Sequence, residues 1–160
     1  MKTLIVLTSP PACGKSTWAK NYQKTHKDCY IVSSDEIRFE LTGKTDDFTK
    51  QDEVWKIFDE RITEKCNEGG KDAIVIADSL MDLNRLRREI VEKHPEFDRF
   101  VLIYFLCLYE ESCINNKNRP SQYIVPDDVL KALWDKFEKP DIKTLDMYDN
   151  FIRIIGNFKN

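Results

Sequence analysis

Short apolar runs alternate along the chain with longer segments in which apolar residues recur every three or four positions. The apolar runs predict five β-strands, at residues 2–7, 29–33, 73–78, 100–108 and 151–155. The periodic segments predict helices that begin near residues 15, 49, 82 and 126. Strands that are apolar on both faces and separated by helices are typical of a parallel sheet covered on both sides. The pattern therefore predicts a three-layer α/β fold with a sheet of about five strands, in which the longest run, 100–108, is central.

The predicted helices carry further signals. In the helix 49–68, Thr49 and Asp52 have the spacing of a capping box. The apolar face of this helix comprises Val54, Phe58, Ile62 and Cys66. The helix that opens at Pro126 is predicted to bury Val129, Leu133, Trp134 and Phe137. In the helix 82–94 we expect a solvated face, or one that steers an anionic acceptor, made by Arg85, Arg87 and Arg88.

The composition, with 41% hydrophobic and 33% charged residues, fits a single domain over residues 1–160. No apolar run approaches the ~20 residues of a membrane-spanning helix, and the N-terminal run is too short for a signal peptide, so we expect a cytoplasmic protein without a membrane partner. Five cysteines without a C-x-x-C pair favour reduced thiols. Cys13, near a helix N-terminus, either favours its thiolate form or is a small filler residue. The net charge of −3 argues against a long basic face, so a nucleic-acid contact should involve few phosphates.

Residues 8–17 read TSPPACGKST, close to the phosphate-binding pattern G-x-x-x-x-G-K-[ST] with Ser9 in place of the first glycine. A predicted strand before this loop and a predicted helix after it are the context that the motif requires. In such a loop backbone N–H groups form an anion nest, Lys15 neutralises the β- and γ-phosphates, and Ser16 offers its hydroxyl to Mg²⁺. We therefore predict a site for ATP and Mg²⁺ formed by Ser9, Ala12, Cys13, Gly14, Lys15, Ser16 and Thr17. The alternative is a chance Gly-Lys-Ser that opens an ordinary helix.

Two carboxylates follow predicted strands. Asp35 comes directly after the strand 29–33, where it could accept a proton from an acceptor hydroxyl, and Arg38 lies one helical turn later, where it could hold an acceptor phosphate. Asp78 ends the strand 73–78 at a position that resembles a Walker B aspartate, and we place it at the metal with Ser16 and at the acceptor with Ser79. For both aspartates the alternative role is a helix N-cap.

Arg119 lies in the polar stretch 115–123, which we interpret as a mobile lid over the phosphates. A cationic lid of this kind stabilises developing charge and excludes water, and a solvated surface charge is the alternative. His26 and His94 have no partners at metal-ligand spacing, so both are interpreted as structural. Trp18, Trp55 and Trp134 fall at core-like spacing, and we assign them no base-stacking role.

Five segments resemble, in their order, the kinase domain of the phage-type polynucleotide 5′-hydroxyl kinases, within the wider P-loop kinase families. These segments are GKSTWA (14–19), DEIR (35–38), IADS (76–79), NKNR (116–119) and VPDDVL (125–130). The resemblance implies a P-loop NTPase fold in which Asp35 is the general base and Arg38 binds the acceptor's phosphate. It implies that Lys15, Ser16 and Arg119 serve the donor. The sequence departs from the family's pattern at Ser9, Leu80 and Asn115.

These features together predict a Mg²⁺- and ATP-dependent kinase that transfers the γ-phosphate to a 5′-hydroxyl end of DNA or RNA. Two rival hypotheses remain: a P-loop kinase of another hydroxyl acceptor, such as a small molecule or an aminoacylated tRNA, and a nucleotide-binding switch without phosphotransfer. The balance of acidic residues favours a small acceptor slightly. The sequence alone does not separate DNA from RNA or ATP from GTP.

Overall fold

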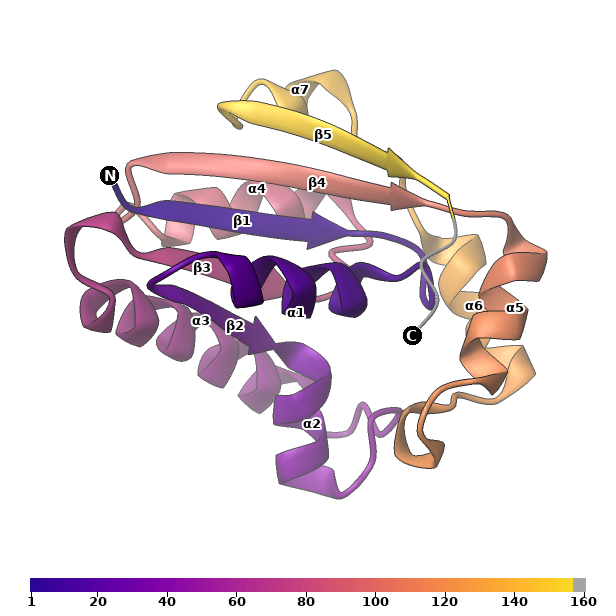
Figure 1. The fold of residues 1–160 in the computed structure, drawn as a ribbon. Helices are drawn as coiled ribbons and strands as arrows, with labels where there is room; N and C mark the ends of the chain where they lie inside the picture. Colours follow the sequence, from indigo (N-terminus) through magenta and orange to yellow (C-terminus); the bar gives the residue numbers. More distant parts are fainter. Residues whose placement is uncertain (157–160) are drawn as a thin grey trace.

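The core of the molecule is a five-stranded parallel sheet in the order β2-β3-β1-β4-β5, described over residues 1–156 in a computed structural model (Figure 1). The strands are β1 (Thr3–Thr8), β2 (Cys29–Ser33), β3 (Ile74–Asp78), β4 (Arg99–Leu106) and β5 (Asn150–Ile155). All five lie where the apolar runs predicted them. The central strand, however, is β1 and not the longest run. The expectation for β4 was wrong because β4 also has a neighbour on each side, so it is as apolar as a central strand without being one.

Helices cover both faces of the sheet, with α1 on one face and α3 and α4 on the other (Figure 1). Their bounds are α1 (Lys15–Thr25), α2 (Ser34–Thr42), α3 (Gln51–Glu68), α4 (Asn84–Lys93), α5 (Tyr109–Lys117), α6 (Asp127–Lys136) and α7 (Ile142–Leu145). Short 3₁₀ turns occupy residues 70–72 and 121–123. Among residues 1–156, no helix has both the length and the apolar character needed to cross a membrane. The arrangement confirms the predicted three-layer α/β architecture.

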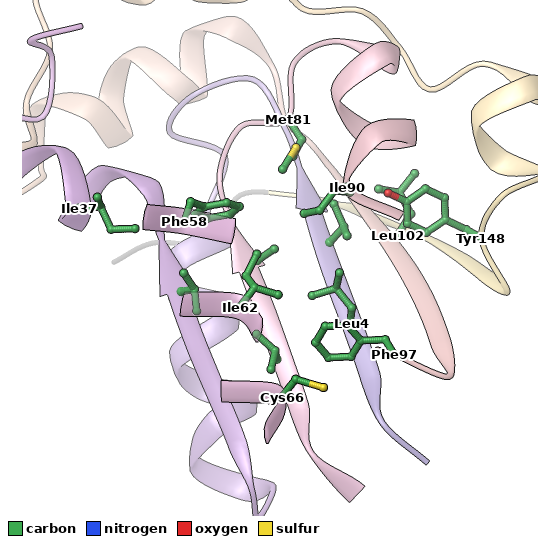
Figure 2. Packing of buried hydrophobic residues seen from close by; sticks show 14 of the residues in the cluster. Leu4, Ile37, Phe58, Ile62, Cys66, Met81, Ile90, Phe97, Leu102 and Tyr148 are labelled. Carbon is green, nitrogen blue, oxygen red and sulfur yellow. The ribbon is translucent and has the colours of Figure 1, made fainter. Parts of the chain in front are cut away.

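Alternate residues of β1 supply the cores on the two faces, as the two-residue period of a strand requires. Leu4 and Val6 belong to the core beneath α3, and Ile5 and Leu7 belong to the core beneath α1. Figure 2 shows the first core, in which Phe58, Ile62 and Cys66 of α3 face Leu4 and its neighbours. The predicted apolar face of α3 is fully buried at all four positions. Each such side chain stabilises the fold by roughly 1.5–3 kcal/mol relative to an exposed position.

The predicted capping box of α3 does not form. The helix begins at Gln51, its N-cap is Lys50, and no side chain caps it. Thr49 instead donates its hydroxyl proton to the Asp47 carboxylate at 2.6 Å, and its backbone N–H bonds to the same oxygen at 3.0 Å. The competing turn at Asp47 therefore removes Thr49 from the capping role.

The apolar face of α6 is only partly covered. Leu130 is its one fully buried residue among those that the structure describes, whereas the four positions predicted to be buried, Val129, Leu133, Trp134 and Phe137, are half-buried. Helix α6 lies beside α5, beyond the end of the sheet, so it does not pack flat against a strand layer (Figure 1). Its amphipathic pattern predicted the correct face but overstated its burial.

Arg87 contradicts the predicted solvated face of α4. Its side chain is completely buried, while Arg85 is 63% exposed and Arg88 is 24% exposed. Arg87 donates to the Thr8 hydroxyl, the Asn84 side chain and the Glu138 carbonyl, at 3.0, 2.8 and 2.6 Å. Its guanidinium also stacks on the ring of Phe137, with its central carbon 5.0 Å from the ring centre. The segment after α6 lies over this part of α4, and that packing removes Arg87 from solvent.

Parallel strands bring the candidate chemistry to one edge of the sheet. Strand β1 runs into the glycine-containing loop, β2 runs directly into α2 with Asp35, and β3 ends at Asp78. Ser33 and Asp78 are register partners in the β2–β3 pair. All three strand ends therefore lie at the carboxyl edge of the sheet, where ligands bind in open α/β folds.

Candidate functional site

The loop between β1 and α1 has the shape of an anion nest. Ala12 and Gly14 both have positive φ, 58° and 89°, which turns successive backbone N–H groups toward the same side. Ser9 is not among the positive-φ residues, so its position does not require glycine. Its side chain is fully buried, its backbone N–H bonds to the Leu80 carbonyl at 3.2 Å, and it lines neither of the cavities described below. Ser9 therefore supports the loop from beneath and does not face a ligand.

Helix α5 holds the other side of this loop. The Ser112 hydroxyl donates to the Pro11 carbonyl at 2.7 Å, and the Asn115 amide donates to the Ala12 carbonyl at 3.0 Å. Trp134 of α6 donates its indole N–H to the Ser112 hydroxyl at 2.9 Å. Both α5 side chains are buried, so these bonds are protected from water. Two consecutive loop carbonyls are thus fixed, which orients the neighbouring N–H groups of the nest.

Cys13 does not have the activated thiolate that its position near a helix N-terminus suggested. Its side chain is 1% exposed, and its sulfur lies 2.7 Å from the sulfur of Cys107, which follows β4. The hydrogen bond to Cys107 and burial raise the pKa of Cys13 far above its ordinary value. The alternative, a small filler residue, describes its packing against the core beneath α1 better.

Lys15, Ser16 and Asp78 form a compact polar group at the start of α1. Lys15 Nζ lies 3.4 Å from Asp78 Oδ1, and both side chains are almost completely buried. The Ser16 hydroxyl donates to Asp78 Oδ2 at 2.8 Å, whereas Asp78 Oδ1 accepts no hydrogen bond. Asp78 does not cap the next helix, because the N-cap of α4 is Leu83. A buried carboxylate oxygen without a hydrogen-bond donor, next to a hydroxyl, suits a hard cation such as Mg²⁺.

The described residues contain no group of three or more His, Cys, Asp or Glu side chains that could hold a metal ion. A cation at this position would therefore take its remaining ligands from water and from the phosphates of a nucleotide, as is usual for Mg²⁺.

Asp35 and Arg38 lie together on the first turn of α2. Arg38 Nη1 lies 2.8 Å from Asp35 Oδ1, and the arginine is buried while the carboxylate is 44% exposed. Asp35 is not the helix N-cap, because Ser33 fills that role by accepting from the Glu36 N–H. Arg38 also donates to the Thr45 carbonyl and to the Gln51 side chain. Most of its donor capacity is used inside the protein, so Arg38 fixes the position of the Asp35 carboxylate.

The segment predicted as a lid is partly helical. Asn115, Asn116 and Lys117 form the last turn of α5, because their backbones continue the helix that begins at Tyr109. Arg119 follows this turn and donates to the Tyr123 carbonyl at 3.4 Å. Burial lowers the pKa of Arg119, and the charges of Asp35 and Asp78 offset part of that effect. Arg119 therefore faces the two carboxylates and is not a solvated surface charge.

The segment after Arg119 also contacts the loop that follows α2. The Thr45 hydroxyl donates to the Gln122 carbonyl at 3.0 Å, across 77 positions of sequence. In Figure 1 the loop after α2 reaches the segment after α5 on the open side of the sheet. This bridge closes one wall of the site and connects it, through Arg38 and Thr45, to Asp35.

Two cavities meet at the candidate residues. The larger, about 580 Å³, is lined by the loop residues 12–17, by α1 and by the start of α2. The smaller, about 370 Å³, lies between α2, α3 and the segment after β3, and its walls include Arg38 and Ser79. The residues that line both cavities are Lys15, Asp35, Arg119 and Tyr123. Ser79 also accepts from Ser34 at 3.0 Å. The structure thus brings every predicted site residue except Ser9 to the walls of one double cavity.

The three aromatic residues that line these two cavities were not predicted as parts of the site. Tyr123 lies at the junction, and Phe48 and Trp55 line the smaller cavity. The Phe48 ring stacks on the guanidinium of Arg38, whose central carbon lies 4.7 Å from the ring centre. No local motif marks these aromatic residues, because they come from the loop before α3, from α3 itself and from the turn 121–123, which meet only in the folded chain. Trp55 is half-buried and packs against the core beneath α3, as its helical spacing suggested, and it also lines this cavity.

The fold and the loop define a P-loop protein of the kinase-like type. The family described as "Chromatin associated protein KTI12" matches residues 2–145, so the chain belongs to this family. The specific assignment to polynucleotide 5′-hydroxyl kinases, which the sequence segments suggested, is not confirmed by that match.

Other similarities agree with this class. The chain is 29% identical over 151 residues to an L-seryl-tRNA(Sec) kinase from Methanococcus maripaludis, covering 88% of this chain and 54% of the kinase. The chain thus spans about half the length of that relative. Among solved structures, Chaetomium thermophilum Kti12 in complex with ADP-AlF3 superposes with a TM-score of 0.69 at 17% identity, covering 95% of this chain and 88% of the other. A chain of the Pnkp1/Rnl/Hen1 RNA repair complex superposes with a TM-score of 0.71 at 17% identity, covering 92% and 46%. At these identities the structural likeness shows the shared fold.

Proposed function

We propose that the protein is a Mg²⁺- and ATP-dependent phosphotransferase that moves the γ-phosphate of ATP to a hydroxyl group carried by a nucleic acid. The observation that carries this proposal is the meeting of Lys15, Asp35 and Arg119 where the two cavities join. The three side chains supply a phosphate-binding cation, a proton acceptor and a second cation within one space. For phosphoryl transfer a protein mainly has to align the reactants and stabilise charge, and these three groups can provide both.

The donor belongs in the larger cavity, because the loop residues 12–17 form its floor. Backbone N–H groups and Lys15 hold the β- and γ-phosphates there. Ser16 and Asp78 would hold Mg²⁺, which neutralises phosphate charge when it is bound. The similarity to a Kti12 structure that contains ADP-AlF3 supports a nucleotide at this place.

The acceptor hydroxyl belongs next to Asp35, on the side of the smaller cavity. Asp35 takes the hydroxyl proton while the acceptor oxygen forms a bond to the γ-phosphorus, and the bond from that phosphorus to the β–γ bridging oxygen breaks to release ADP. Arg38 holds Asp35 through the 2.8 Å ion pair. Arg119 stabilises the charge that develops on the transferred phosphoryl group.

A polyanionic acceptor is supported by helix α1. The first 27 residues contain five lysines and no Asp or Glu, although the whole chain has a net charge of −3. Lys20 and Lys24 lie one helical turn apart and line the larger cavity, which contains the donor site and joins the acceptor side at Asp35. Their ammonium groups would attract the phosphates of a strand whose end reaches Asp35.

Two acceptors of this class are candidates. The first is the 5′-hydroxyl end of DNA or RNA, which the ordered segments of the sequence favour. The second is a hydroxyl carried on tRNA, which is favoured by the likeness to a protein named L-seryl-tRNA(Sec) kinase over 88% of this chain.

A transfer assay with labelled γ-phosphate tests the proposal. The panel contains 5′-hydroxyl RNA, 5′-hydroxyl DNA, seryl-tRNA and free nucleosides, each with ATP and Mg²⁺. We expect label on a nucleic-acid acceptor, a loss of at least 10²-fold in Asp35→Asn, and no change in Asp127→Asn, an exposed carboxylate on α6. Label only on nucleosides would contradict a nucleic-acid acceptor. Binding of ADP without transfer to any acceptor would instead support the nucleotide switch.

Salt dependence gives a second test of the acceptor class. An acceptor strand held through one to three phosphates should show a log–log affinity slope of about −0.7 per phosphate. Lys20→Gln with Lys24→Gln should reduce that slope, whereas Lys139→Gln with Lys143→Gln removes the same charge from the exposed segment around α7 and should leave it unchanged. A slope near zero in the wild type would count against a nucleic acid.

A further inference from the structure

Two thiols meet behind the phosphate-binding loop. Cys13 lies in that loop between Ala12 and Gly14, and Cys107 follows the last residue of β4. The two sulfur atoms are 2.7 Å apart although the residues are separated by 94 positions. The other three cysteines, at positions 29, 66 and 113, are free thiols as well. Neither the proposed phosphotransfer nor the described site uses this contact.

The two thiols differ in accessibility. Cys13 is 1% exposed, while Cys107 is half-buried and can be reached from solvent. The contact between the two sulfurs lowers the pKa of Cys107, whereas the same contact together with burial raises that of Cys13. Cys107 is therefore the sulfur that an oxidant meets first, and Cys13 is the thiol placed to resolve it.

We propose that Cys13 and Cys107 form a reversible disulfide when the protein meets a hydroperoxide. The Cys107 thiolate attacks one peroxide oxygen and the O–O bond breaks. The leaving hydroxide takes up the proton that the Cys107 thiol had released, so one water leaves and Cys107 becomes a sulfenic acid. The Cys13 sulfur then attacks the Cys107 sulfur, the S–O bond breaks, and the thiol proton leaves with the hydroxyl as a second water. Two thiols and one hydrogen peroxide thus become one disulfide and two waters. A dithiol reductant reverses the reaction by exchange.

The disulfide would tie the phosphate-binding loop to the end of β4. Its formation needs little movement, because the two sulfurs are already in contact. It would also close a long loop in the unfolded chain, which stabilises the folded state. Reduced thiols remain the resting state in a reducing compartment, and in such compartments disulfides are usually transient and redox-sensing. The proposal is independent of the proposed function, since it requires no nucleotide or acceptor.

Peptide mapping of the purified protein after brief treatment with hydrogen peroxide tests the proposal. We expect one intramolecular link between the peptides that contain Cys13 and Cys107, its disappearance after dithiothreitol, and a thermal midpoint raised by about 5 °C or more in the oxidised wild type. Cys113→Ser is the matched control, because Cys113 is also half-buried and lies on the neighbouring helix α5. This variant should form the link normally.

Cys107→Ser and Cys13→Ser should both lose the link and the rise in thermal midpoint. Cys107→Ser changes a half-buried position, so its folding in the reduced state can be verified by the unchanged midpoint without peroxide. Sulfinic acid on Cys107 with Cys13 still free, or a link between any other pair of cysteines, would overturn the proposal.

Discussion

Asp78 has the contacts expected of the metal ligand that our proposal assigns to it. One oxygen accepts from Ser16, and the other faces Lys15 at 3.4 Å without accepting a hydrogen bond. Desolvation of such a group is unfavourable unless a cation compensates for it. A bound Mg²⁺ would supply that compensation together with the Lys15 ammonium.

We therefore predict that Asp78→Asn lowers the affinity for ADP only when Mg²⁺ is present. The amide keeps the size of the side chain and a contact to Ser16, but it removes the negative charge that Mg²⁺ requires. Affinity for ADP should fall about tenfold in the presence of Mg²⁺ and should not fall in its absence. Isothermal titration with and without Mg²⁺ measures both values. Asp82→Asn, another buried carboxylate at the same sheet edge, should keep the wild-type dependence on Mg²⁺. An equal loss under both conditions would show that Asp78 acts only through the fold.

At the scale of single residues, the sequence predicted the site positions that directly follow a strand. Asp35 and Asp78 follow apolar runs, and parallel strands place such positions at one edge. Arg87 and Asn115 could not be predicted in this way, because their partners lie in distant segments. Arg87 bonds to a carbonyl 51 positions away, and Asn115 bonds to one 103 positions away. A polar residue on an amphipathic helix carries no local sign of such a partner.

At the scale of secondary-structure elements, helix α5 fixes the phosphate-binding loop through two side-chain hydrogen bonds. Ser112 and Asn115 fix the carbonyls of Pro11 and Ala12, and Ala12 has a positive φ that is unfavourable for a residue with a side chain. Without these bonds the loop would relax from the nest conformation, and nucleotide binding would have to restore it.

Asn115→Ala and Ser112→Ala should each weaken ADP binding by about tenfold, with the larger change in the double variant. Asn118→Ala is the control, because Asn118 is exposed at the end of the same helix. Ser112→Thr keeps the hydroxyl and should restore most of the affinity. If the variants lose thermal stability but bind ADP like the wild type, α5 stabilises the fold without positioning the loop.

Helix α4 is joined to the segment after α6 by Arg87. This guanidinium is completely buried, burial lowers its pKa to about 10, and its three acceptors are a hydroxyl, an amide and a carbonyl. Tyr148 donates in turn to the Arg87 carbonyl at 2.6 Å. Arg87 thus connects helix α4 to the end of β1 and to the segment after α6.

Arg87→Met should lower the free energy of unfolding by about 2–4 kcal/mol, because methionine fills part of the space but leaves buried acceptors without donors. Arg85→Met, two residues earlier on the same helix, removes an exposed arginine paired with Glu89 and should change stability by no more than about 0.5 kcal/mol. Urea unfolding measures both values. Equal effects of the two substitutions would mean that the buried network contributes no net stability.

At the scale of the whole molecule, the strands were predicted more accurately than the helix ends. Five apolar runs were sufficient for the sheet, because parallel strands covered by helices are rich in apolar residues. The edge strand β5 has the same composition although it is largely exposed. The start of α3 and the burial of α6 depended on a turn at Asp47 and on the absence of a strand layer beneath α6. Both features depend on the tertiary structure, so the capping and periodicity patterns of the sequence do not predict them.

The stability of the whole molecule should depend on pH through a cluster remote from both cavities. His94 is buried and lies 2.9 Å from Asp59 and 2.8 Å from Glu96, while Thr63 donates to the same Glu96 oxygen. Burial by itself would lower the pKa of His94, but the bonds to the two carboxylates outweigh it, so the pKa is raised. For Glu96 burial would raise the pKa, and the bonds from His94 and Thr63 lower it.

The signs of these shifts define a window of maximal stability. A raised histidine pKa contributes stability that is complete below about pH 6.5 and is lost as the pH rises through the folded-state value. A lowered glutamate pKa contributes stability that is complete above about pH 4.3 and is lost as the pH falls through the folded-state value. The contribution of this cluster should therefore be greatest between about pH 5 and 6.5.

We predict that the free energy of unfolding, measured with urea between pH 5 and 9, falls above about pH 6.5 with a slope of at most about 1.4 kcal/mol per pH unit from this histidine. His94→Gln keeps polar groups at the site but cannot titrate, so its curve should lose this component of the slope. His26→Gln is the matched control, because His26 is exposed and stacks on Tyr22 without a carboxylate partner among the described residues. Its curve should follow the wild type. A wild-type stability that instead rises between about pH 5 and 7, with that rise absent from His94→Gln, would mean that His94 is buried in its neutral form.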